Sequence, residues 1–150
     1  MPSQTRCCYD SLRLMEILNK VSQVPKQTLA VVPETMIIHS LAADADIPPE
    51  VMRSKLYFIA KTTDELSIVI PETVPIESDD SDGGWRALEV LGPLNLSMVG
   101  IMAAIGNVLA KAKISIFVLS TFETDYFLVK NKSLESALRA LESDGYTVIR

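Results

Sequence analysis

The C-terminal half of the chain changes between two kinds of hydrophobic pattern, and their order predicts a fold. Residues 84–91 form a strand candidate, and from Ser97 onward apolar residues recur at helical spacing. Residues 114–121 and 125–130 are short β-branched and aromatic runs separated by three residues. Two such runs at this distance predict a β-hairpin.

A second helix and a last strand complete this half. Ser133 is expected to cap a helix with one apolar face, and Gly145 stands where a helix C-cap belongs. Residues 146–149 are the last predicted strand. The order strand, helix, strand, strand, helix, strand is the ferredoxin-like arrangement. We therefore predict an α+β fold with an antiparallel sheet and its helices on one face.

The first half of the chain repeats part of this pattern. Residues 56–62 match 116–122 in their apolar pattern, about 60 positions apart. Residues 65–69 match 125–129 at the same offset. The repeated pattern therefore predicts two ferredoxin-like units in tandem, and the second helix of the first unit is degenerate.

The pattern before the repeat is weaker. Residues 29–32 and 36–41 are short strand candidates, and one helical turn is expected at 50–52 after two prolines. Residues 10–21 fit a helix or the start of a strand.

This organisation predicts four segments. They are a flexible N-terminus over 1–10, a degenerate first unit over 11–76, an acidic linker or loop over 77–84 and a second unit over 85–150. The strand at 85–91 could close the first unit or open the second. We assign it to the second unit and leave open that the two units share an edge or exchange strands.

Composition and charge exclude several classes of function. The chain has 150 residues, is 48% hydrophobic and carries a net charge of −5. A globular fold is expected, and the charge argues against nucleic-acid binding. Neither a signal peptide nor a membrane span is expected. The two cysteines are adjacent and form no disulfide framework, so we expect a reducing, cytoplasmic compartment.

Catalytic patterns are scarce in this sequence. His39 is the one histidine and lies in a β-branched run, where a surface or half-buried strand histidine is the expected role. No nucleophile-elbow, P-loop or dinucleotide motif occurs. The acidic run at 77–84 lacks the spacing of a calcium loop. We therefore predict that the protein is not an enzyme and needs neither a metal nor another cofactor.

The start of the helix after the first strand of the second unit is a candidate anion site. Unpaired N–H groups and the helix dipole favour a carboxylate at such a position. The residues concerned are Ser97, Met98, Val99, Gly100 and Ile101. The alternative is that Gly100 allows close packing against a neighbouring element and Ser97 merely caps the helix.

The hairpin turn contributes the second candidate group. In the predicted fold this turn lies near the helix start, which places Thr121, Phe122 and Asp125 within reach of Gly100. A helix start for a carboxylate and an aspartate for an ammonium group are complementary to an α-amino acid. The alternative is a polar hairpin turn in which Asp125 bonds to the local backbone.

Both faces of the predicted hairpin are apolar. Phe117 and Leu119 face opposite to Ile116 and Val118. A two-layer unit needs only one apolar face, so the other face is expected to be covered. Packing within one chain and dimerisation explain this excess equally well.

Several blocks of this sequence resemble tandem ACT-domain proteins. The blocks are 56–72, 84–94, 99–101 and 120–129, in the order of the family, and the resemblance spans roughly residues 55–150. The branch is the one related to the cytosolic arginine sensor of animals and to the regulatory part of aspartate kinase.

The resemblance implies βαββαβ units that bind small amino acids at the interface between two units and act as sensors or regulatory modules. By position, Gly100 and its neighbours face the ligand carboxylate, Thr121 and Phe122 line the pocket, and Asp125 holds an amino group or a basic side chain. The arginine sensor has four units and this chain has room for two, so a homodimer is expected to complete the pocket. The alternative is an interaction module that has lost its ligand and docks on a regulated enzyme or signalling protein.

Overall fold

The computed structural model describes residues 26–92 and 99–150. The strands of this part form a seven-stranded sheet in the order β2-β3-β1-β4-β6-β5, with β7 beside β1. The elements are β1 (Thr28–Ala42), α2 (Pro49–Arg53), β2 (Phe58–Lys61), β3 (Glu65–Pro71), β4 (Asp80–Leu91), α3 (Ile101–Lys111), β5 (Ile116–Ser120), β6 (Asp125–Lys130), the 3-10 turn η1 (Asn131–Ser133), α4 (Leu134–Ser143) and β7 (Thr147–Ile149). The N-terminal segment 1–10 and the ambiguous stretch 10–21 lie outside the described residues.

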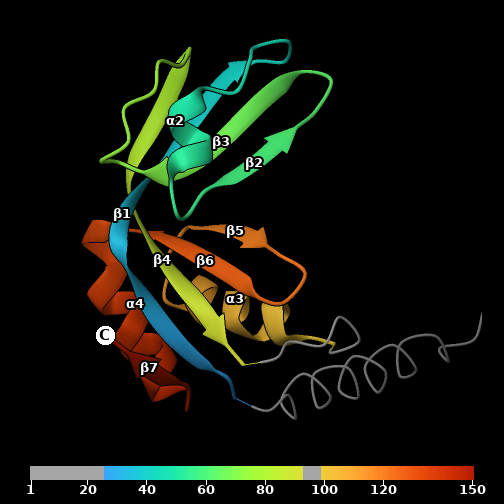
Figure 1. Ribbon diagram of the computed structural model, residues 1–150. Coiled ribbons are helices and arrows are strands. Elements are labelled where there is room, and N and C mark those ends of the chain that lie inside the picture. The colour runs from blue at the N-terminus through green and yellow to red at the C-terminus, as the bar shows by residue number, and fades with distance from the viewer. Residues whose placement is uncertain (1–25, 93–98) are drawn as a thin grey trace, which may run out of the picture.

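The two long strands β1 and β4 run through both halves of the molecule (Figure 1). We call the upper half in this view the first lobe. It contains β2, β3, α2, residues 36–42 of β1 and residues 80–82 of β4. The second lobe contains β5, β6, β7, α3, α4, residues 28–31 of β1 and residues 85–91 of β4. Each long strand therefore completes the sheet of both lobes, which is the strand exchange that the sequence left open.

Two expectations about these strands are wrong. The separate strands expected at 29–32 and 36–41 form one strand of 15 residues, because β4 pairs along it across an irregular register between Val31 and Thr35. Residues 80–84, expected in a linker or loop, begin β4. Acidic and glycine residues are tolerated at this end of β4 because residues 80–82 pair with β1 alone, while β6 pairs only with residues 85–89, and because Asp82 is paired with Lys130.

Helix starts and ends follow the sequence signals only in part. α3 begins at Ile101, and its N-cap is Gly100 in the left-handed region at φ 89°. A left-handed residue cannot continue a helix, so the described helix begins at Ile101. The expected cap Ser97 lies outside the described residues. Ser133 stands at the N-cap of α4 as expected but makes no side-chain cap bond.

The end of α4 confirms the expected glycine cap. Gly145 has φ 92°, and its N–H donates to the Glu142 carbonyl at 3.0 Å. The N–H of Tyr146 donates to the Leu141 carbonyl at 3.0 Å. These two bonds form a Schellman motif, in which glycine adopts the left-handed conformation without strain.

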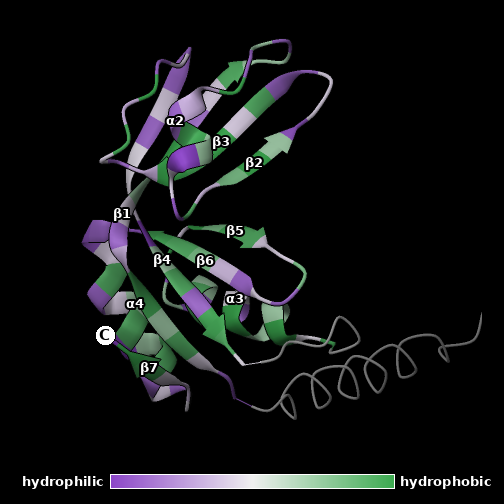
Figure 2. Ribbon diagram, in the orientation of Figure 1, coloured by the Kyte–Doolittle hydropathy of each residue, from purple (hydrophilic) through white to green (hydrophobic). Residues whose placement is uncertain are grey.

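Three apolar clusters hold the layers together. α3 and α4 cover the outer face of the second lobe, where Phe127, Ile105 and Leu138 are buried. α2 covers the outer face of the first lobe around Ile68 and Val51. The hydropathy view shows hydrophobic strand residues on both lobes where they meet (Figure 2). Between the lobes lies a third cluster, which we call the inter-lobe core, with the buried residues Val32, Met36, Val69, Trp85, Ala87 and Leu128 and the partly buried Ile38, Leu56, Phe58, Phe117, Leu119 and Tyr126.

The inter-lobe core explains why both faces of the hairpin are apolar. Phe117 and Leu119 of β5 pack on the first lobe of the same chain. The rings of Phe58 and Tyr126 meet across the lobes at 5.1 Å, with an edge-on angle of 66°. Packing within one chain therefore accounts for the second apolar face.

The repeat is real, but its offset is 59 residues and not 60. In the first hairpin Phe58 pairs with Val69, and in the second Phe117 pairs with Leu128. Both turns are closed in the same way, because Thr62 N–H donates to Glu65 O and Thr121 N–H donates to Thr124 O. Strand register depends on such pairs, which an apolar pattern alone does not distinguish from a shift of one residue.

Candidate functional site

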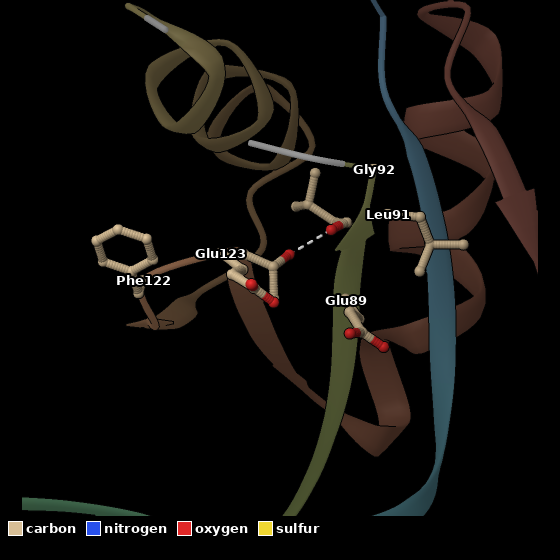
Figure 3. Close-up of a pocket in the computed structure, with 7 residues that line it drawn as sticks. Glu89, Leu91, Gly92, Phe122 and Glu123 are labelled. Carbon is tan, nitrogen blue, oxygen red and sulfur yellow. Dashed lines mark hydrogen bonds between the residues drawn. The ribbon is translucent and has the colours of Figure 1, made fainter. Parts of the chain in front are cut away.

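A pocket of about 430 Å³ lies where β4 ends beside the turn between β5 and β6 (Figure 3). We call it the β4-end pocket. Its lining comes from two segments, Glu89, Val90, Leu91 and Gly92 on β4 and Phe122, Glu123 and Thr124 on the turn. The Thr124 hydroxyl donates to the Val90 carbonyl and so fastens the turn to the strand. This bond holds the two walls of the pocket together.

The charged side chains that line the β4-end pocket are both acidic, namely Glu89 and Glu123. The phenol of Tyr126 donates to Glu89 Oε1 at 3.0 Å. Burial, together with this carboxylate, raises the pKa of Tyr126 to about 12. The phenol therefore stays protonated at neutral pH and holds Glu89 in place, and the pocket favours a ligand that carries positive charge.

Of the three predicted turn residues, only Phe122 lines the β4-end pocket. Phe122 lines the pocket with 79% of its surface exposed. The Thr121 hydroxyl accepts the N–H groups of Glu123 and Thr124 and serves the turn itself. Asp125 accepts a hydrogen bond from the Ser120 hydroxyl at 2.6 Å and is not among the lining residues.

The predicted helix start is described from residue 99 onward. Val99 is 87% exposed, Gly100 is the N-cap, and Ile101 is 5% exposed within the outer core of the second lobe. Ile101 is thus a core residue, although its N–H belongs to the helix start. Ser97 and Met98 lie outside the described residues.

The start of α3 carries no compensating charge in its described part. Its first turn contains no acidic residue, and the N-cap Gly100 has no side chain to accept an N–H. The first intrahelical bond of this turn runs from Ala104 N–H to Gly100 O at 2.8 Å. The N–H groups of the first turn therefore have no intrahelical acceptor and point out of the helix at its N-terminal end.

Sequence reasoning missed three acidic or polar residues of the pocket, Glu89, Glu123 and Thr124. Glu123 and Thr124 lie in the turn between the predicted residues Phe122 and Asp125. The sequence therefore predicted the correct turn but not these two residues. Glu89 carries no local signal, because its place in the pocket depends on how far β4 extends beside β6.

His39 lies on strand β1 as expected, but it is buried and not at the surface or half-buried. It is 5% exposed, and its Nδ1 lies 2.8 Å from the Ser78 hydroxyl. Burial lowers the pKa of its imidazole. Among residues 26–92 and 99–150 no three His, Cys, Asp or Glu side chains gather as a metal site. The longest helix in that part of the chain, α3, has 11 residues, and none has the length and hydrophobicity to span a membrane.

The fold and the pocket define a class of protein, a tandem α+β protein with two ferredoxin-like units that exchange strands. The sequence model described as ACT domain matches residues 80–143. Protein Atu0741 of Agrobacterium tumefaciens is a similar solved structure at 31% identity, with a TM-score of 0.76, covering 83% of this chain and 93% of that one. The chain belongs to the ACT-domain family.

Two further proteins are similar to this chain. The putative protein CASTOR3P of Homo sapiens is 29% identical over 110 residues, which span 65% of this chain and 67% of that protein. The regulatory subunit of aspartate kinase from Thermus thermophilus covers 81% of this chain and 99% of its own, with a TM-score of 0.56. Its identity of 13% shows a shared fold.

Proposed function

We propose that this protein is a non-enzymatic regulatory protein that binds a small amino acid in the β4-end pocket. The observation that carries the proposal is the presence of two carboxylates, Glu89 and Glu123, in the pocket lining. The start of α3, whose first turn contains no acidic residue, is not among the lining residues and is proposed as the second half of the site. An amino acid has one group for each of these. Its ammonium group meets the carboxylates, and its carboxylate meets the N–H groups of α3.

The pocket also supports a contact for the side chain of the ligand. Phe122 stands at the mouth of the pocket with most of its ring exposed, which is a costly position for an aromatic side chain in water. At the corresponding position, 59 residues earlier, the first turn has Thr63. The two turns bond alike, so the phenylalanine is not needed for the turn and is available for a ligand.

The proposal gives separate roles to the residues around the pocket. Glu89 and Glu123 hold the ammonium group, and Asp125, on the same turn, orients Ser120 and adds negative charge nearby. Gly100 and the N–H of Ile101 receive the carboxylate. Ser97 and Met98 belong to the same proposed helix-start site.

A second copy of the chain is proposed to close the pocket. The lining described here comes from one strand end and one turn, so the far side of a bound ligand is left to another molecule. A homodimer in the cytoplasm that controls an enzyme or signalling protein is the proposed setting. The competing proposal is a module that docks on a partner through its apolar sheet face. This face is not available for docking, because it lies in the inter-lobe core.

A thermal-shift screen with the twenty amino acids tests the proposal. An amino acid at 100 times its dissociation constant should stabilise the fold by about 2.7 kcal/mol. For a chain of this length this corresponds to a rise in Tm of about 5 to 11 °C. Glu123→Gln and Asp125→Ala should each reduce the rise.

The chain offers a matched control in its own repeat. Asp64 corresponds to Glu123 at the offset of 59 and lies on the first turn, outside the β4-end pocket. Asp64→Asn should leave the ligand response unchanged. If all twenty amino acids leave Tm unchanged, or if Asp64→Asn and Glu123→Gln act alike, the proposed function is wrong. Light scattering with and without the stabilising amino acid tests the dimer.

A further inference from the structure

The two lobes are related by the repeat, and one position breaks the relation. In the second lobe Tyr126 lies on the inner face of β6 and packs edge-on against Phe58 of the first lobe at 5.1 Å. The offset of 59 relates Phe58 to Phe117 and Tyr126 to Ser67. The residue that would pack against Phe117, as Tyr126 packs against Phe58, is therefore Ser67. Its side chain is much smaller than that of tyrosine.

A pocket lies where the repeat would place the missing ring. Its volume is about 280 Å³, and Phe117 and Ser67 are both among its lining residues. We call it the inter-lobe pocket. Three adjacent strands of the first lobe form its floor and Phe117 of the second lobe lies across from them, with the lining completed by Ile38, His39, Ser40, Glu65, Asp80, Ser81 and Asp82.

The floor of the inter-lobe pocket is polar where the neighbouring surface is apolar. Ser40 pairs directly with Ser67 on one side and with Asp80 on the other, so these three side chains share one face of the sheet. One row earlier on that face, Ile38 and Val69 belong to the inter-lobe core. The pocket thus continues the inter-lobe core as a hollow with hydroxyl and carboxylate groups on its floor.

The charge of the inter-lobe pocket is negative. Asp82 is paired with Lys130, whereas Glu65 and Asp80 take part in none of the ion pairs among the described residues. Glu65 accepts a hydrogen bond from the Ser40 hydroxyl at 3.2 Å, and Asp80 accepts the N–H of Ser81 at 2.8 Å. Two carboxylates of the lining therefore have no cationic partner in the described part of the chain.

We propose that the inter-lobe pocket is a second ligand site, which takes a small amine with an aromatic or other apolar body. The body of the ligand occupies the place that Tyr126 fills in the other lobe and packs against Phe117. The ammonium group lies between Glu65 and Asp80, with the hydroxyls of Ser40 and Ser67 beside it. This site is distinct from the β4-end pocket, since the two share none of their lining residues.

The test uses phenethylamine as the probe and 3-phenylpropionate as its matched control. Both have the same aromatic body, but the control carries a carboxylate in place of the ammonium group. Two-dimensional amide NMR of the full chain should show saturable shifts around Ser67 and Phe117 with millimolar phenethylamine. The carboxylate should produce none, because Glu65 and Asp80 repel it.

Variants separate the two features of the site. Ser67→Tyr restores the residue type that the repeat has in the other lobe, so it should fill the pocket, preserve the fold and abolish the shifts. Asp80→Asn should weaken binding about tenfold, the usual effect of losing one charge-assisted hydrogen bond. Asp64→Asn, a matched charge removal outside the pocket, should bind as the unmodified chain does.

Several results would overturn the proposal. They are the absence of a saturable shift, equal binding of 3-phenylpropionate, and undiminished binding in Ser67→Tyr. If Ser67→Tyr does not fold, equal affinity in Asp80→Asn and the unmodified chain has the same consequence. Glu123→Gln, in the β4-end pocket, should leave amine binding unchanged, so failure of this site and failure of the proposed function can be told apart.

Discussion

The role of the inter-lobe core can be tested at Leu128. This side chain is fully buried, and its strand neighbours are Phe117 on β5 and Ala87 on β4. It belongs to the face whose cover the sequence left undecided between the same chain and a partner. We predict that Leu128→Ala destabilises the single chain, because the structure buries this face within one molecule.

The magnitude follows from the burial of Leu128. Replacing a fully buried leucine by alanine removes apolar contacts and leaves a cavity, at a cost of about 3 kcal/mol in the free energy of unfolding. For 150 residues, each kcal/mol lowers Tm by about 2 to 4 °C. The expected fall is therefore about 6 to 12 °C.

Thermal unfolding of Leu128→Ala at several protein concentrations provides the assay. A cover supplied by the same chain predicts the same fall in Tm at every concentration, whereas a cover supplied by a partner predicts a fall that depends on concentration. Met52→Ala is the control, since Met52 is 61% exposed and its loss should change stability by about 0.5 kcal/mol or less. A fall below about 2 °C, or one that vanishes at high concentration, would refute the reasoning.

Three further predictions concern stability and ionisation. Burial lowers the folded pKa of His39, so the stability that its neutral form contributes is complete above the unfolded pKa of about 6.5 and is lost as the pH falls below it; Tm should drop more between pH 7 and pH 5.5 than in His39→Gln, and NMR should show a midpoint below 6.5. Gly145→Ala should lower the free energy of unfolding by about 1 kcal/mol, and Lys113→Gly, at φ 59°, should raise it by about 0.5 kcal/mol, both measured by urea unfolding. The pKa of Tyr126 is about 12, so its contribution to stability is present below the unfolded pKa of about 10 and lost as the pH rises through 12; ultraviolet titration of Tyr126→Phe should lack this late ionisation, and a midpoint near 10 in the unmodified chain would contradict the bond to Glu89.

Part of the candidate site could be predicted from the local sequence, and part of it depends on how far strand β4 extends. The turn at 121–125 could be selected from its polar residues, because turn chemistry depends on neighbours in sequence. Which of its side chains face the pocket could not, since this depends on the end of β4 beside it. Phe122 lines the pocket, whereas Glu89 enters it only because β4 pairs with β6 as far as Tyr126.

The sequence by itself determined the order and type of the elements in the second unit. Apolar spacing and capping residues are local, so helix α4, which Gly145 terminates, and the hairpin at 114–130 follow from neighbouring residues. The same locality made the repeat visible in the apolar pattern. It left the offset uncertain by one residue, because both registers present apolar residues on both faces.

Only the tertiary structure decided how the two units join. β1 is a single strand because different partners pair with it along its length, β3 in one lobe and β7 in the other. The acidic start of β4 is a strand because β1 supplies its hydrogen bonds, against the preference of its own residues. Pairing between distant segments outweighs local strand propensity when it completes two sheets at once. Such pairing cannot be read from any window of neighbouring residues.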